Sequence, residues 1–438
     1  MTRRALTAGL VAMVTLVAFE YMAVAVAMPV VARELDGVPL YGLAFSGSMA
    51  SGVIGTVLGG RWADLRGPLA PLWAGVATFA GGLAVAGFAP AMEVLILGRL
   101  VQGFGGALVS VALYVVVARA YPEEQHPKIF SLFATAWVVP SMVGPAVVGI
   151  VVDTAGWRWV FLGVPILTAL AAMVLRHGLA GQPVVGGQAE PAPGLAAKIG
   201  WAAVTAVGAG LMQYGSSGDF LLVVAGLVVL FVALPKLLPA GTMKAAGGLP
   251  AVVALRGLAT GALFAAEVII PLMLVDSRGL SPLLAGFALT GGALTWSFAS
   301  WLQGRGVFSR MTNLRGGSAL IALGILAMGA VTFDAVPVWL AYPSWIVTGF
   351  GMGLIYPTLS VLTLEISRPG EQGMNTSALQ VGEAVFSVVA VAVTGALFTA
   401  AGSGYWTVYA ATLAMALAGF WVAPRALAAQ RARQVVTV

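Results

Sequence analysis

Apolar runs of about 20 residues recur along most of this chain, and they constrain its fold more than any other feature. A run of that length crosses about 30 Å of hydrocarbon as an α-helix. Two shorter runs in the middle of the chain begin at Trp201 and Phe220, which brings the predicted number of spans to fourteen. The other twelve predicted spans cover residues 8–31, 41–63, 69–90, 93–118, 128–151, 157–178, 253–275, 281–303, 317–334, 337–364, 375–400 and 404–423.

The composition excludes several classes of protein. Only 9% of the 438 residues are charged and 60% are hydrophobic, which is too few charges for the surface of a soluble domain. The chain has no cysteine and two distant histidines, so we expect no disulfide, no metal centre and no cofactor. The net charge of +6 comes from scattered basic residues, which argues against a nucleic-acid surface. We therefore predict an all-α polytopic membrane protein.

The basic residues predict how the spans are oriented. With a cytoplasmic N-terminus, only Arg33, Arg158 and Arg278 lie outside, and Arg99 lies within a span. The remaining eighteen of the 22 basic residues, Arg256 among them, fall on the cytoplasmic side, as the positive-inside rule requires. Twelve spans would keep this bias but would leave a nearly uncharged loop of about 40 residues, so fourteen are favoured. Both termini are then cytoplasmic, and the Arg-rich, Ala-rich composition favours a bacterial inner membrane.

The predicted spans divide the chain into four parts. Residues 1–178 form a six-helix bundle, and residues 179–200 form a cytoplasmic linker that is rich in Gly and Pro. Residues 201–238 supply two extra helices. Residues 239–438 form a second six-helix bundle with a short cytoplasmic tail. We expect the protein to be a monomer.

Three carboxylates and one arginine lie inside predicted spans. Glu20 interrupts the apolar stretch VAFEYMAVAVAMP, and Glu267, Glu383 and Arg99 are placed similarly. A charge near the centre of a bilayer costs about 2.5–3.5 kcal/mol on insertion scales. Such residues therefore indicate a functional site, although a structural ion pair would also account for any one of them.

Two motifs resemble those of the major facilitator superfamily. GGRWADLRGP places Gly60, Asp64, Arg66 and Gly67 at the spacing of its cytoplasmic gate motif G-x-x-x-D-R-x-G-R-K, with Leu65 in place of the usual Arg. GRLVQGFGGAL, which contains Arg99, resembles the motif R-x-x-Q-G-x-G-x-A.

Further motifs resemble the fourteen-helix drug:proton antiporters of that superfamily. PSMVGPAVVG, from Pro140 through Gly144 and Pro145 to Gly149, is similar to the antiporter motif G-x-x-x-G-P-x-x-G. GWRWVFLGVP resembles W-R-W-x-F-x-x-N-x-P, and FEYMAVAVAMP resembles L-D-x-T-I-V-N-V-A-L-P, with Glu20 in the position of the acid. The resemblance covers nearly the whole chain.

The resemblance implies proton-coupled efflux of lipophilic, often cationic, drugs by alternating access, without a cofactor. Glu20 would exchange protons, Arg99 would control its protonation, and Glu267 and Glu383 would tune substrate binding. Partners would be a small-molecule substrate, protons and membrane lipid, with no nucleic acid. Residues that could line the cavity are Tyr21, Gln102, Tyr114, Trp137, Tyr214, Trp296, Tyr356 and Gln380.

Three other functions stay open. The first is a dedicated proton-coupled exporter of one endogenous metabolite or lipid, which the sequence does not separate from drug efflux. An intramembrane enzyme would need a nucleophile or metal constellation, and none is found. A channel is less favoured than a transporter because the proline motif and the paired halves indicate alternating access.

Overall fold

The computed structural model describes residues 2–37, 40–182, 184, 194–215, 220–400 and 404–428, and these contain helices and no strand. The N-terminal part comprises α1 (Thr2–Glu34), α2 (Tyr41–Arg66), α3 (Leu69–Gly87), α4 (Met92–Ala120), α5 (His126–Thr135), α6 (Val138–Ala155) and α7 (Arg158–Leu179). Next come α8 (Leu195–Gly215) and α9 (Phe220–Leu237). The C-terminal part comprises α10 (Leu249–Leu272), α11 (Pro282–Gly304), α12 (Gly317–Ala330), α13 (Ala341–Ile366), α14 (Gln372–Ala400) and α15 (Tyr405–Ala426).

The structure contradicts the predicted count of fourteen spans. Twelve helical segments among the described residues are long and apolar enough to cross a membrane, and α2 and α11 do not contribute any of them. The two central runs expected as an extra pair, α8 and α9, are both among the twelve. Both helices that fall outside the count contain many Gly, Ser and Thr residues, and the count covers only the described part of each. Residues 183 and 185–193 of the predicted linker 179–200 lie outside the described residues.

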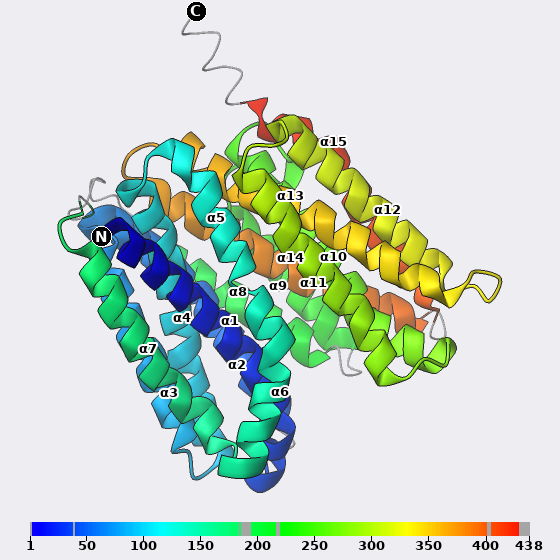
Figure 1. Cartoon of the computed structure of the whole chain (residues 1–438), viewed down its shortest axis with the longest axis horizontal. Helices are drawn as coiled ribbons and strands as arrows, with labels where there is room; N and C mark the ends of the chain where they lie inside the picture. Colours follow the sequence, from blue (N-terminus) through cyan, green and yellow to red (C-terminus); the bar gives the residue numbers. More distant parts are fainter. Residues whose placement is uncertain are drawn as a thin grey trace, which may run out of the picture.

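The helices form two bundles that lie side by side (Figure 1). In the first bundle, α4 packs against α2 and α3, and α1 packs against α6 and α7. In the second, α13 packs against α11 and α12, and α10 packs against α14 and α15. α8 pairs with α9 and also contacts α2 and α14, so it lies across a seam between the two bundles.

Glycines bring the main helices of each bundle into close contact. A Cβ atom at Gly103 of α4 would overlap the backbone of Ser48 on α2, and one at Gly349 of α13 would overlap that of Gly292 on α11. The two bundles thus repeat the same kind of crossing. Small residues permit this approach between membrane helices, where dispersion and weak hydrogen bonds stabilise the contact.

The fifth predicted span is broken in its middle. α5 ends at Thr135 and α6 begins at Val138. Pro140 has no N–H to donate to the carbonyl of Ala136, so a regular helix cannot continue across this point. The break places Trp137 between the two helices with 40% of its surface exposed.

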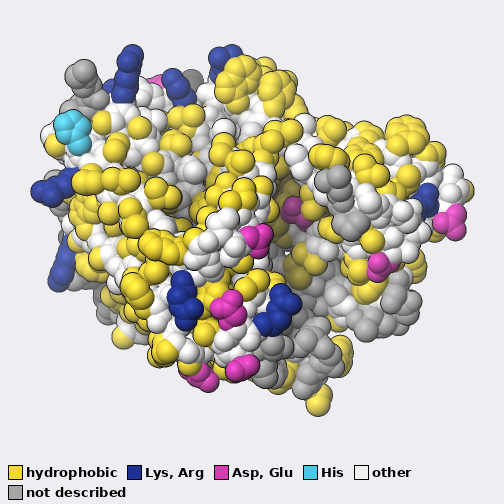
Figure 2. All heavy atoms as spheres, turned by 60° about the horizontal axis from the view of Figure 1, so that its bottom comes forward, with side chains coloured by type: hydrophobic (Ala, Val, Ile, Leu, Met, Phe, Trp, Pro, Cys, Tyr) yellow, Lys and Arg dark blue, Asp and Glu magenta, His cyan; other side chains and the backbone are white. Residues whose placement is uncertain are grey.

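The two bundles touch at one end of the molecule and separate at the other. α2 packs against α14 near Asp64, and α5 packs against α11 and α13. At the α5 contact, a Cβ atom on Gly304 of α11 would lie only 2.6 Å from Ser131 Oγ. Figure 2 brings the opposite end forward and shows a hollow between the two parts of that face, with acidic side chains at its edge. The structure therefore closes the end that carries Asp64.

Candidate functional site

Glu20 and Arg99 form a buried ion pair in the first bundle. Glu20 lies on α1 with 4% of its surface exposed, and Arg99 lies on α4 with 3% exposed. An Arg99 Nη1 N–H donates to Glu20 Oε1, and Gln102 Nε2 donates to Glu20 Oε2 at 2.9 Å. Arg99 also donates to Gln102 Oε1 at 2.6 Å and to Ser48 Oγ at 3.1 Å. Both carboxylate oxygens thus have a donor, which a charge away from water requires.

Glu267 lies on α10, in the second bundle. Among the described residues it has no hydrogen bond and no ion pair. Tyr21, on α1 of the other bundle, lies within electrostatic range of Glu267. The ring of Tyr21 packs edge-on against Trp137, with centroids 6.3 Å apart, and Tyr21 is 53% exposed. A carboxylate of one bundle without a partner among the described residues thus lies near an accessible aromatic ring of the other.

The second bundle contains another buried ion pair, which the sequence analysis missed. Arg256 was predicted as a cytoplasmic topology residue, but the structure buries it completely. Its Nε donates to Glu383 Oε2 at 2.9 Å, and Nη1 donates to the carbonyl of Tyr356 at 2.7 Å. Arg256 Cζ lies 3.0 Å from the centroid of the Tyr356 ring. The signal was present, because Arg256 lies inside the predicted span 253–275 with apolar residues on both sides.

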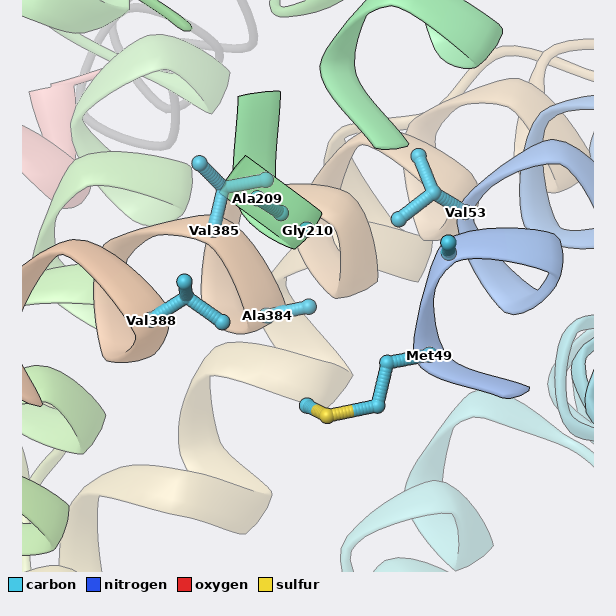
Figure 3. Close-up of a pocket in the computed structure, with 8 residues that line it drawn as sticks. Met49, Val53, Ala209, Gly210, Ala384, Val385 and Val388 are labelled. Carbon is cyan, nitrogen blue, oxygen red and sulfur yellow. The ribbon is translucent and has the colours of Figure 1, made fainter. Parts of the chain in front are cut away.

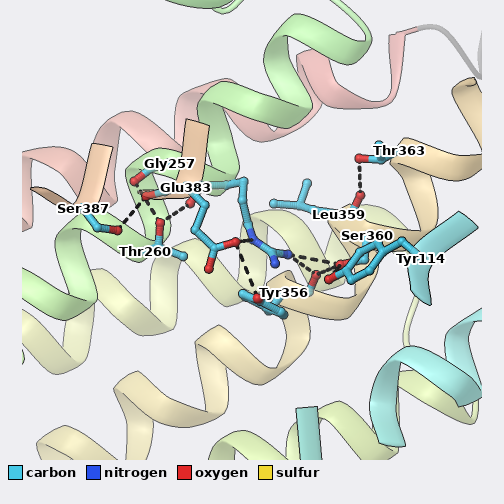
Figure 4. Close-up of polar contacts among 10 residues, drawn as sticks. Tyr114, Gly257, Thr260, Tyr356, Leu359, Ser360, Thr363, Glu383 and Ser387 are labelled. Carbon is cyan, nitrogen blue, oxygen red and sulfur yellow. Dashed lines mark hydrogen bonds and ion pairs between the residues drawn. The ribbon is translucent and has the colours of Figure 1, made fainter. Parts of the chain in front are cut away.

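This second cluster reaches across to the first bundle (Figure 4). Nη1 of Arg256 also donates to Ser360 Oγ at 3.2 Å. The Ser360 hydroxyl in turn pairs with the hydroxyl of Tyr114, on α4, at 3.4 Å. Glu383 is therefore connected to the opposite bundle through Arg256, Ser360 and Tyr114.

Asp64 connects α2 to the N-terminus of α14. Oδ1 accepts a hydrogen bond from the backbone N–H of Gly373 at 2.7 Å, and Oδ2 accepts one from that of Met374 at 2.9 Å. These N–H groups have no partner within the helix, and the positive end of the helix dipole favours a carboxylate there. A Cβ atom on Gly60 would lie 2.5 Å from the Gly373 carbonyl oxygen. Gly60 and Asp64 thus form the closed contact together.

For the other predicted motif residues the structure shows no ion pair or interbundle hydrogen bond among the described residues. Arg66 is exposed at the end of α2, and Gly67 follows it with a φ of 86°, which favours glycine. Pro140 is buried, and Pro145 lies inside α6. A Cβ atom on Gly144 would make ordinary contact with Met22 Cβ at 3.8 Å, and one on Gly149 would meet no described atom within 4 Å. In this conformation the predicted close packing around Gly149 is absent from the described residues.

The remaining candidate cavity residues fall into two groups. Gln102 belongs to the Glu20 cluster, and Tyr114 and Tyr356 belong to the Arg256 cluster. Trp296 packs against Tyr356 with ring centroids 5.5 Å apart. Gln380 lies one helical turn before Glu383 on α14. The side chain of Tyr214 lies outside the described residues.

An apolar pocket lies at the seam between α2, α8 and α14 (Figure 3). It is small in this conformation and partly open to the surroundings. Its lining contains no charged residue and consists of Met49, Ala50, Val53, Ala209, Gly210, Ala384, Val385 and Val388. Because Ala384 follows Glu383 directly, the pocket lies next to the second ion pair.

Comparisons with known proteins agree on the class of molecule. A family model described as "Major Facilitator Superfamily" matches residues 10–390. A probable multidrug-efflux transporter of Mycobacterium tuberculosis (strain H37Rv) is 26% identical over 356 residues, which cover 75% of this chain and 74% of that protein. A multidrug transporter protein of Bacillus subtilis (strain 168), MdtP, is 24% identical over 413 residues and 91% of this chain, and 76% of that protein is covered.

A solved structure supports the fold. The crystal structure of the human organic anion transporter MFSD10 (TETRAN) superposes with a TM-score of 0.72. The match covers 96% of this chain and 99% of that one at 15% sequence identity. At this level of identity the likeness describes the fold alone.

Proposed function

The chain belongs to the Major Facilitator Superfamily, and we propose that it exports lipophilic small molecules, cations among them, across a bacterial cytoplasmic membrane in exchange for protons. Members of this superfamily are transporters rather than enzymes, and an ion gradient rather than a cofactor supplies their energy. The relatives named multidrug transporters, which align with 75% to 91% of the chain, support drug efflux.

The observation that carries the proposal is the buried Glu20 with its two donors. Of the described side chains, only Arg99 and Gln102 hydrogen-bond to its carboxylate. A proton on Glu20 removes the charge that Arg99 neutralises, and Arg99 then keeps Gln102 and Ser48 as acceptors. The guanidinium thus has polar partners whether Glu20 is protonated or ionised. Glu20 can therefore exchange a proton while Arg99 keeps hydrogen-bond acceptors.

Substrate binding is assigned to the space between the bundles. The unpaired carboxylate of Glu267 attracts a positive charge, and the exposed faces of Tyr21 and Trp137 suit a lipophilic cation. A cation near Glu267 disfavours a proton on the same carboxylate. We therefore assign competition between substrate and proton to Glu267, and the main proton exchange to Glu20.

The conformational change in this proposal is a rocking of the two bundles. Residues 1–178 and 239–438 form the moving units, which the linker 179–200 and the helices in 201–238 join. Asp64 holds the cytoplasmic side shut through the N-terminus of α14, and both termini lie in the cytoplasm. The structure then corresponds to the state that faces outward. A monomer suffices, because both bundles of one chain supply the site.

The test is proton movement in everted membrane vesicles that contain the wild type or Glu20→Gln. A pH-sensitive dye reports proton release from the vesicle lumen when a lipophilic cation such as tetraphenylphosphonium is added. We expect a response in the wild type and a loss of at least about 90% in Glu20→Gln, because removing a catalytic proton carrier typically costs about 10²-fold or more.

The matched control is Glu124→Gln, which makes the same change at an exposed position in the short turn before α5. It should behave like the wild type. Full proton-driven export by Glu20→Gln would contradict the assignment of Glu20. Absence of proton movement in the wild type with every cation and neutral drug tested would contradict drug efflux.

The apolar pocket between α2, α8 and α14 favours a second candidate, the export of one endogenous lipid or apolar metabolite. A lining without charged groups suits an acyl chain, which would have to widen the pocket on binding. Proton movement triggered by a single lipid class, and by no drug, would favour this candidate over multidrug efflux.

A further inference from the structure

The guanidinium of Arg256 is fully buried but is not fully hydrogen-bonded. Its Nε and Nη1 have acceptors in Glu383, Tyr356 and Ser360. Within the described part of the chain, Nη2 has no partner. A buried N–H group without an acceptor is costly, so native structures nearly always supply one. A bound molecule or water must therefore satisfy Nη2.

Two further donors without partners lie near this cluster, one beside Tyr356 and one a helical turn from Glu383. Trp296 Nε1 and Gln380 Nε2 are buried and lack an acceptor among the described residues. Trp296 packs against the ring of Tyr356, whereas Gln380 precedes Glu383 by one turn of α14. Three buried N–H donors near Tyr356 and Glu383 thus lack an acceptor among the described residues, and a ligand with oxygen acceptors would satisfy them.

The residues around Arg256 also indicate how a ligand would enter and what its apolar part would be. The side chain of Glu383 keeps 19% of its surface exposed while that of Arg256 has none, so the cluster is reached from the side of Glu383. The aromatic rings of Trp296 and Tyr356 lie beside the donors, and they favour a flat apolar body. Arginine N–H groups form charge-assisted hydrogen bonds with oxyanions such as carboxylates, and Nη2 of Arg256 is the one of its nitrogens left to donate one.

We propose that Arg256, Trp296 and Gln380 form a substrate subsite that binds the carboxylate of an amphipathic aromatic acid. This inference rests on the proposed transport function, because the ligand is a molecule that the protein exports. Glu267 lies eleven residues farther along α10, about 16 Å away at 1.5 Å per residue. The central space would therefore offer a cation-selective position and, separately, a carboxylate-selective one.

The experiment compares two probes that differ only in their charged end, pyrenebutyrate and pyrenebutylamine. Fluorescence anisotropy measures the binding of each to the purified full chain in detergent. The test variant combines Arg256→Gln with Glu383→Gln, so that no single buried charge is left behind. We expect the affinity for pyrenebutyrate to fall about tenfold or more, since its charge-assisted hydrogen bonds are lost. The affinity for pyrenebutylamine should change less than about twofold.

The control variant combines Arg310→Gln with Glu365→Gln. Arg310 donates two hydrogen bonds of 2.6 Å to Glu365 in the same bundle, and the side chain of Arg310 is 42% exposed. This variant removes an Arg–Glu pair of the same kind outside the proposed subsite, so both affinities should stay at the wild-type values. Equal losses for both probes, or an unchanged affinity for pyrenebutyrate in the test variant, would overturn the inference.

A milder variant keeps the test decisive if the double substitution fails to fold. Trp296→Phe removes the indole N–H but keeps an aromatic ring. It should weaken pyrenebutyrate about threefold and leave pyrenebutylamine unchanged. If it affects neither probe, the subsite is wrong.

The vesicle assay distinguishes a failure of the proposed subsite from a failure of the proposed transport function. Cation-driven proton release without any carboxylate selectivity would reject the subsite and keep the transport proposal. Carboxylate-selective binding without any proton movement would reject proton-coupled export and keep the binding site.

Discussion

At the scale of residues, each bundle contains one buried arginine paired with one glutamate. Arg99 and Glu20 join α4 to α1, while Arg256 and Glu383 join α10 to α14. A buried ion pair contributes little net stability, but removing one partner leaves the other charge without compensation. The effect of a substitution at these positions therefore depends on whether the partner keeps its charge.

This dependence predicts the outcome of a double-mutant cycle. Arg99→Gln should destabilise the protein by about 3–5 kcal/mol, because the Glu20 carboxylate stays buried without its countercharge. Arg99→Gln combined with Glu20→Gln should recover most of that loss. Unfolding of the purified proteins, followed by intrinsic tryptophan fluorescence, gives the two values. A double variant no more stable than Arg99→Gln would mean that Arg99 stabilises the fold independently of Glu20.

The sequence singled out Glu20, Arg99, Glu267 and Glu383, since a charge within an apolar run is visible without a structure. It did not reveal the partner of Glu383. Arg256 lies 127 positions earlier in the chain, near the start of a predicted span, where an arginine also fits the role of a cytoplasmic anchor. The position of a charged residue within a span can be read from that span alone. Its ion-pair partner depends on how segments far apart in the sequence pack together.

At the scale of elements, α2 and α11 explain where the sequence prediction of the fold was wrong. Small residues such as Gly55 of α2 and Gly292 of α11 occupy their crossings with α4 and α13. Such residues serve close packing rather than contact with lipid. Hydropathy reports contact with lipid, so the two-bundle fold was predictable while the number of spans was not.

The α2–α14 contact leads to a prediction for Gly60→Ala. The added methyl group would lie 2.5 Å from the Gly373 carbonyl oxygen and 2.8 Å from Ser377 Cβ, so the two helices must move apart. The chain has no cysteine, and Ser377→Cys places a single thiol in this contact. Maleimide labelling of that thiol should be about tenfold faster in Gly60→Ala, as expected when a local opening becomes easier.

Gly81→Ala provides the control for this measurement. Gly81 is exposed on α3, and a Cβ atom there would meet no described atom within 4 Å. Labelling in this background should match the wild-type rate. If Gly60→Ala also matched it, the α2–α14 contact would tolerate a methyl group, and Gly60 would not be needed for closure.

At the scale of the whole molecule, the bundles are joined at the end that carries Asp64 and apart at the other. In the proposed cycle, weakening the Asp64 contact favours the opposite arrangement. Spin labels on introduced cysteines can report both ends. Thr154→Cys with Leu284→Cys probes the open end, and Lys128→Cys with Glu371→Cys probes the closed end; all four positions are exposed.

We expect Asp64→Asn to shift both distributions of distances. An amide oxygen can replace one of the two acceptors in Asp64 but not both, so the contact loses about 1–3 kcal/mol. The Thr154–Leu284 distance should decrease and the Lys128–Glu371 distance should increase, in a fraction of the molecules that depends on this loss. Unchanged distributions in Asp64→Asn would mean that other contacts determine which end is closed.

The contact of Asp64 with α14 has a consequence for how this chain can change over generations. Its donors are backbone N–H groups of Gly373 and Met374, and every residue except proline supplies such a group. The side chain at position 374 is thus free to change without loosening closure, and the two hydrogen bonds to Asp64 involve no side chain of α14 whose replacement could compensate for its loss. The two ends of this contact accordingly leave no paired changes in the sequences of descendants, although they hold the two bundles together.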